Sequence, residues 1–229
     1  AKTALDEFGM GGTGLTAHTG IIKNPWDNTR ICGGSSAGSA CSVAAGVFPY
    51  ALGSDTGDSI RKPAAYCGIV GYKPTYGMIS RYGLFPFASS LDTCGVLTRS
   101  VSDAALVVDA MKGIDENDQT SWDSSSIDLF KNLNKNVKEK KLFYIKEIVD
   151  ISNYPNANAE LKIHLNNFNK SIEKLKNIGV IVDEVSIDKT LLSTIPSVYV
   201  CISCAEATSN MSNLTGISFG PRGTGDNIM

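Results

Sequence analysis

The pattern that most constrains the fold lies in the second half of the chain. An apolar stretch at 141–145 (KLFYI) is followed by an amphipathic segment at 158–177 and a second apolar stretch at 180–187 (VIVDEVSI). Apolar side chains recur at helical spacing in the middle segment, and Gly179 ends it. Strand, helix and strand in this order favour a parallel pair with a helical crossover. We therefore predict an α/β fold with a mixed, largely parallel sheet flanked by helices.

The first half of the chain shows shorter elements of the same kinds. Small residues from Ala37 to Val47 indicate a tightly packed helix, and two short strands are expected at 48–54 and 67–74. Ser100 has the type and position of an N-cap for a helix that Gly113 ends. The alternation of strands and helices thus extends over most of the chain.

Composition and charge narrow the protein class. The 229 residues are 42% hydrophobic and 19% charged with a net charge of -2, which is typical of a soluble globular protein and does not point to nucleic acid. No uninterrupted apolar run approaches the roughly 20 residues of a membrane-spanning helix, and no signal peptide is expected. We predict a cytoplasmic protein without membrane contact, a polar loop or linker near 114–140, and a final helix over about 191–211.

Six cysteines raise the question of disulfides or a metal site. Cys201 and Cys204 form C-x-x-C inside a helical-looking run, and the others are irregularly spaced. Only His18 and His164 could add imidazole ligands, which is a poor basis for zinc. We expect reduced thiols and no metal.

Two glycine-rich motifs suggest functions that their context disfavours. The stretch GMGGTG at 9–14 matches G-x-G-x-x-G, but it follows no strand. The stretch at 34–38 matches the G-x-S-x-G nucleophile elbow, which requires a preceding hydrophobic strand and a later histidine. Turn-like residues precede it, and His164 falls beside the apolar stripe of the amphipathic segment.

The segment LGSDTGDSIRKPA at 52–64 is more informative. It places Asp55 to Ser59 between a predicted strand and a tight turn, where successive backbone N–H groups could converge on an anionic oxygen. Ser59 stands at the end of that arc, and Ser35 precedes the small-residue helix. Two serine sites therefore flank one helix.

These blocks, together with YCGIVGYKPTYG and SRYGLFPFASSLDTCGVLTRSVSDAA, resemble the amidase signature family, closely over 3–112 and loosely over 190–220. Members of that family are serine hydrolases with a Ser–cis-Ser–Lys triad. RYGLFPFASSLD and LDEFGMGG are most similar to its tRNA-dependent amidotransferase branch, in which an A subunit hydrolyses glutamine and passes ammonia to its partner.

The resemblance implies a role for each serine. Ser59 would be the nucleophile, and Ser35 would relay the proton after a cis peptide bond from Gly34, with the two hydroxyls in hydrogen-bond reach. Asp58 stands where the family has glycine, so we expect a strained backbone there. The oxyanion would be held by the backbone N–H groups of Thr56, Gly57, Asp58 and Ser59.

The family's lysine lies some tens of residues before the Gly-Gly-Ser-Ser block. We therefore expect it outside this chain, which would be the central part, 1–229, of one amidase domain that lacks its N-terminal and C-terminal portions. Such a fragment is expected to be inactive alone, although the full-length subunit would be an enzyme.

The resemblance also implies substrate and partners. Glutamine would be the substrate, B and C subunits the partners, and tRNA would be contacted mainly through a partner subunit. No cofactor is expected in this chain, whereas ATP and magnesium are expected in the partner. Two alternatives stay open: a stand-alone amidase acting on another carboxamide, and a non-catalytic subunit with an amidase fold, which Asp58 favours.

Overall fold

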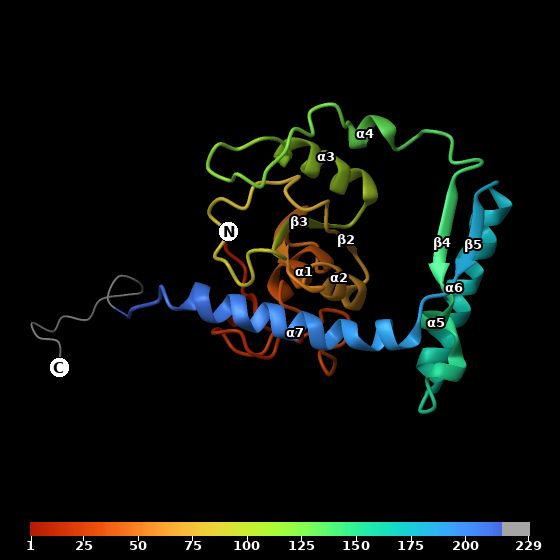
Figure 1. The fold of residues 1–229 in the computed structure, drawn as a ribbon, viewed down its shortest axis with the longest axis horizontal. Coiled ribbons are helices and arrows are strands. Elements are labelled where there is room, and N and C mark those ends of the chain that lie inside the picture. Colours follow the sequence, from red (N-terminus) through yellow and green to blue (C-terminus); the bar gives the residue numbers. More distant parts are fainter. Residues whose placement is uncertain (217–229) are drawn as a thin grey trace, which may run out of the picture. The chain divides into compact units, whose positions relative to one another are not determined.

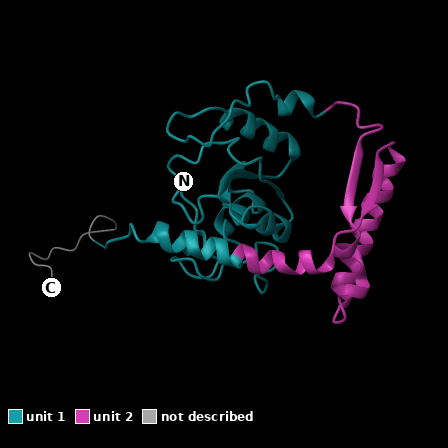
Figure 2. Cartoon of the chain, viewed as in Figure 1, with its two compact units in different colours: residues 1–133, 200–229 teal, residues 134–199 magenta. Residues whose placement is uncertain are grey.

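The computed structural model describes residues 1–216, which divide into two units. One unit contains residues 1–133 and the chain from Val200 onward, and the other contains residues 134–199 (Figure 2). The boundary after Leu133 falls inside the predicted loop at 114–140. The end of the predicted amidase domain, residues 217–229, lies outside the described residues.

A three-stranded sheet with the strand order β1-β3-β2 forms the centre of the first unit; β2 and β3 are labelled in Figure 1. Both outer strands pair antiparallel with β3, so they run in the same direction on either side of it. The parallel pairing that we predicted is therefore absent from this sheet, because β3, which we did not predict, lies between the two predicted strands. The strands are β1 (Tyr50–Asp55), β2 (Val70–Tyr72) and β3 (Thr93–Thr98).

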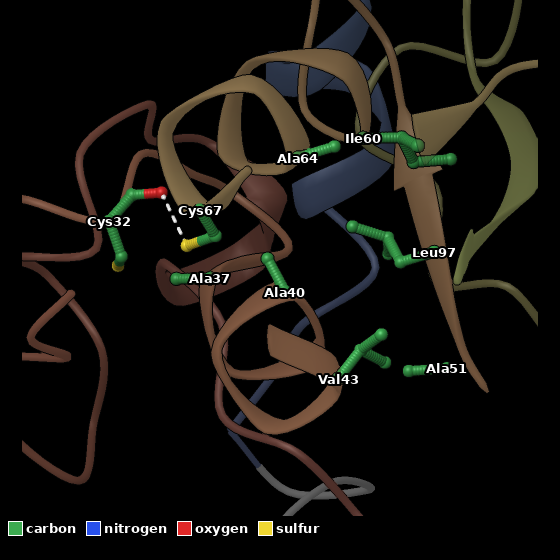
Figure 3. Close-up of a cluster of buried hydrophobic side chains, with 9 residues drawn as sticks. All are labelled: Cys32, Ala37, Ala40, Val43, Ala51, Ile60, Ala64, Cys67 and Leu97. Atoms are coloured by element: carbon green, nitrogen blue, oxygen red, sulfur yellow. Dashed lines mark hydrogen bonds between the residues drawn. The ribbon is translucent and has the colours of Figure 1, made fainter. Parts of the chain in front are cut away.

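Two short helices, α1 (Ala37–Ala44) and α2 (Arg61–Cys67), pack against each other, with α1 also on β1 and α2 also on β2. We expected a turn in place of α2, but Pro63 lies in its first turn, where proline is tolerated. Small side chains let the two helices approach closely (Figure 3). The buried cluster that they share with the sheet comprises Cys32, Ala37, Ala40, Val43, Ala51, Ile60, Ala64, Cys67 and Leu97.

β3 is buried on both faces, because alternate side chains enter different clusters. Leu97 belongs to the cluster under α1 and α2, whereas Val96 packs with Met78 and Val108 in a second cluster. The second cluster lies under α3 (Val101–Met111), whose predicted N-cap is confirmed: the Ser100 hydroxyl accepts from the Asp103 N–H at 3.1 Å. This unit also contains two short helices, η1 (Glu7–Gly9) and α4 (Leu129–Asn132).

The second unit confirms the predicted strand–helix–strand pattern. β4 (Lys141–Ile145) and β5 (Ile181–Val185) pair in parallel, and α6 (Ala159–Asn177) connects them. The Tyr144 ring meets Phe168 of α6 edge-on at 5.4 Å, which attaches the helix to the strand. Both strand orientations thus occur in the described α/β structure. Two short helices, α5 (Lys146–Val149) and η2 (Ile151–Asn153), follow β4.

The last helix, α7 (Lys189–Met211), is the longest of the described helices and runs from the second unit into the first. By length and composition alone it could cross a membrane. Our search for an uninterrupted apolar run missed it, because serine, threonine and Pro196 break up the run without adding charge. Near its end, the Glu206 carboxylate accepts from the Ser90 N–H at 2.9 Å, which ties α7 to the segment before β3.

Candidate active site

Two loops bring Ser35 and Ser59 to the beginnings of neighbouring helices. Ser35 lies two residues before α1 and Ser59 two residues before α2, and both are buried. The N–H of Ser36 donates to the Ser59 carbonyl at 3.1 Å and joins the loops directly. The Gly34–Ser35 peptide bond is cis, in agreement with the resemblance.

The hydroxyl of Ser35 is the unusual group of this pair. The residue is 1% exposed, and its Oγ has no hydrogen-bond partner among the described residues. The hydrogen bond that we expected between the two hydroxyls is therefore not formed here. Since nearly all buried polar atoms are paired, an unpaired hydroxyl needs an explanation. Catalytic hydrogen bonds often form fully only with substrate present, and a relay serine is such a group.

Asp55 shapes the loop that carries Ser59. This residue ends β1, is 1% exposed, and accepts from the Ile60 N–H at 3.0 Å. It also accepts from Arg61 Nε at 3.1 Å and Nη2 at 2.9 Å, and this hydrogen bonding raises the pKa of Arg61. The end of the strand is thereby linked to the start of α2, so that the five residues between them, 56–60, form a tight loop.

That loop offers a row of backbone donors. Among the described residues, none of the N–H groups from Thr56 to Ser59 donates a hydrogen bond. Four successive N–H groups without a protein acceptor are available to bind an anionic oxygen. This arrangement supports the predicted oxyanion hole.

Asp58, the residue that replaces a family glycine, sits in this loop without the expected strain. It is absent from the described non-glycine residues with positive φ. Its carboxylate lies 2.7 Å from Lys62 Nζ, one helical turn further on. The side chain is therefore paired with a cation, while the Asp58 N–H stays in the loop.

A buried aspartate supports the other serine loop. Asp6 is fully buried and accepts from the N–H groups of Thr13, Gly14 and Thr16 at 3.0 to 3.1 Å. Burial raises the pKa of Asp6, but these hydrogen bonds outweigh it and hold the pKa below its usual value. A Cβ at Gly34 would overlap the Asp6 carboxylate, so the two segments require glycine here. The 9–14 motif thus belongs to a loop organised by Asp6.

A cavity of about 470 Å³ opens beside Ser35. Gly9 and Ser54 line it, and a Cβ at Gly9 would lie 3.8 Å from Ser35 Oγ. Aromatic rings supply much of its surface, and Phe8 and Phe85 pack against each other at 6.0 Å between ring centres. The cavity could hold the chain that carries a carboxamide.

His18 lines the cavity, whereas His164 lies on α6 in the other unit, and none of the lining residues is a cysteine. His18 and His164 are exposed, and all six cysteines are free thiols. Within residues 1–216 no group of three potential ligands could hold a metal ion. The residues that our sequence reasoning missed are Asp6 and Asp55. An aspartate at a strand end, followed six residues later by arginine, is the signal that could have identified Asp55.

Comparison with known proteins places this geometry in a family. A model of the amidase family matches residues 1–228. The A subunit of glutamyl-tRNA(Gln) amidotransferase from Staphylococcus saprophyticus is 47% identical over 219 residues, which is 96% of this chain and 43% of that protein. The corresponding protein of Staphylococcus epidermidis is 46% identical over the same shares. The chain therefore spans less than half the length of these relatives.

Solved structures give the same result. The A subunit of glutamyl-tRNA(Gln) amidotransferase from Thermotoga maritima superposes with a TM-score of 0.82 at 40% identity, covering 92% of this chain and 44% of that one. The peptide amidase of Stenotrophomonas maltophilia reaches 0.76 at 28% identity, covering 93% and 44%.

Proposed function

Because this chain belongs to the amidase family, we propose that it carries the serine pair of a glutamine amidase that supplies ammonia for tRNA-dependent transamidation. The observation that carries the proposal is the buried Ser35 hydroxyl, which has no partner among the described residues. Its loop is joined to the Ser59 loop by a backbone hydrogen bond. Glutamine is favoured over a peptide amide because identity is 46–47% to amidotransferase A subunits and 28% to the peptide amidase.

In the proposed reaction, Ser59 Oγ attacks the carboxamide carbon. Its proton passes through the Ser35 hydroxyl to a neutral lysine, and the free N–H groups of the 56–59 loop bind the oxygen as it becomes negative. Collapse of the tetrahedral intermediate breaks the C–N bond, and the protonated lysine returns the proton so that ammonia leaves. Water then attacks the acyl-serine by the same route and restores Ser59.

The base in this proposal comes from outside the chain. Lys62 is the lysine adjacent to the Ser59 loop, but its Nζ lies 2.7 Å from the Asp58 carboxylate and makes no hydrogen bond to Ser35 Oγ. An additional lysine, in a part of the full-length protein upstream of Ala1, would face Ser35.

The partners and location follow from the same proposal. We infer a cytoplasmic A subunit that works with B and C subunits and contacts tRNA mainly through them. ATP and magnesium would be used by the partner, and the chemistry assigned to this chain requires neither.

Ammonia release from glutamine tests the function. We expect turnover by the full-length protein purified with its partner subunits. The turnover number of the 229-residue chain should be lower by about 10²- to 10⁴-fold or more, because general-base assistance has this magnitude. Equal turnover would show that the base lies within these residues. Hydrolysis of other carboxamides but not glutamine would indicate a stand-alone amidase, and no hydrolysis of any would indicate a non-catalytic subunit.

A further inference from the structure

Asp92 is a buried carboxylate that the mechanism above does not use. It directly precedes β3 and is 2% exposed. Asp55 of β1 pairs with Thr93 of β3 in the antiparallel ladder. One residue further along, beyond the ends of these strands, Asp92 therefore lies opposite Thr56. The sheet register therefore places this carboxylate at the first residue of the 56–59 loop.

Each oxygen of Asp92 accepts a hydrogen bond. Oδ1 accepts from Thr56 Oγ1 at 2.5 Å and from the Ala88 N–H at 3.1 Å. Oδ2 accepts from the Phe87 N–H at 2.9 Å. Asp92 forms no ion pair with another described residue, and these three donors are its hydrogen-bond partners. Hydrogen bonds to a charged acceptor are shorter and stronger than neutral ones, so Thr56 is firmly held.

The 56–59 loop is thus fixed at both ends by buried aspartates. Asp55 holds its far end through the N–H groups of Ile60 and Arg61, and Asp92 holds its near end through Thr56. Threonine has a stiff χ1 angle, so fixing its hydroxyl also restricts the backbone that carries its N–H. Oxyanion stabilisation depends on donors that are held in place before the reaction.

We propose that Asp92 is a positioning residue of the amidase reaction, which orients the first donor of the oxyanion loop through the hydroxyl of Thr56. The inference rests on the proposed function. Asp92 also lines the cavity beside Ser35, but the proposal gives it no part in bond making or breaking. It accounts for a buried carboxylate, without an ion-pair partner among the described residues, next to a loop whose N–H groups are free.

Steady-state kinetics of the full-length protein with its partner subunits test this role. Asp92→Asn and Thr56→Val are each expected to lower kcat for glutamine about 10²- to 10³-fold, the cost of losing one oxyanion donor, with KM within about threefold. Thr56→Ser keeps the hydroxyl and should recover most of the loss. Because both changes break one contact, the double variant should be no slower than the worse single variant.

Thr93→Val is the matched control. Thr93 is the next residue on β3, is 4% exposed, and donates its hydroxyl to the Leu91 carbonyl at 3.3 Å. It should leave kcat unchanged. A purely structural role for Asp92 predicts instead that Thr56→Val keeps wild-type kcat, or that Thr56→Ser is as slow as Thr56→Val; either result overturns the proposal. The proposal is also overturned if the losses of kcat from Asp92→Asn and Thr56→Val multiply in the double variant.

The two threonine variants decide the question even if Asp92→Asn does not fold. Failure of this inference is also distinct from failure of the proposed function. If Ser59→Ala loses activity while Thr56→Val does not, only the role of Asp92 is wrong.

Discussion

Replacing Ser59 with alanine is expected to lower kcat for glutamine hydrolysis by at least about 10⁴-fold in the full-length protein, because losing the nucleophile of a serine hydrolase has this magnitude. The two serines of the adjoining loop have other roles: Ser35 is the proposed relay, and Ser36 Oγ is engaged with the backbone of Ser54. Ammonia release at saturating glutamine measures the effect.

Ser42→Ala is the control for this substitution. Ser42 lies on α1, and its hydroxyl donates to the Gly38 and Ser39 carbonyls of the same helix. Its removal should leave kcat near wild type. A Ser59→Ala protein that keeps even a tenth of wild-type turnover would contradict the assignment of the nucleophile.

Replacing Ser35 with alanine is expected to separate activity from stability. Turnover should fall about 10²- to 10⁴-fold through loss of the proton relay. Residual activity is expected if a water molecule replaces the Ser35 hydroxyl. Thermal stability should not fall, because the lost hydroxyl has no partner and removing an unsatisfied buried group is neutral or favourable. Thermal melting and ammonia release on the same preparation measure both effects.

The neighbouring serine provides the comparison. Ser36 Oγ donates to the Ser54 carbonyl at 3.2 Å and accepts from its N–H at 3.3 Å. Ser36→Ala should therefore cost about 1 kcal/mol or more of unfolding free energy. If Ser35→Ala were instead the less stable of the two, or turned over at the wild-type rate, the relay assignment would be wrong.

The elements that the sequence predicted well depend on local pattern. The β4–α6–β5 unit has a complete 3.6-residue apolar period between two short apolar runs, and its parallel pairing follows from chain connectivity. The helix after Ser100 has its cap within three residues. In these cases one stretch of chain contains all the information that the structure uses.

The features that escaped prediction depend on contacts between distant segments. β3 (TCGVLT) contains a cysteine and a glycine that weaken its strand pattern, and it is a strand because β1 and β2 pair with both of its edges. That insertion also makes the first sheet antiparallel. Asp6 and Asp55 look like ordinary polar residues until the fold surrounds them with backbone donors.

The candidate site divides in the same way. The prediction that Ser35 and Ser59 are site residues rests on motif resemblance, because long sequence blocks surround both serines. The unstrained Asp58 could not be foreseen, since its conformation and its ion pair with Lys62 depend on where α2 begins.

The central claim is that Ser59 is a nucleophile activated through Ser35. A fluorophosphonate tests it most directly, because this reagent phosphonylates an activated serine and releases fluoride. After reaction with the full-length protein and its partner subunits, peptide mass mapping should locate the adduct on Ser59, and Ser35→Ala should slow its formation by about the same factor as its turnover. An adduct on another serine of this chain, or an unlabelled Ser59 in protein that still releases ammonia, would contradict the account.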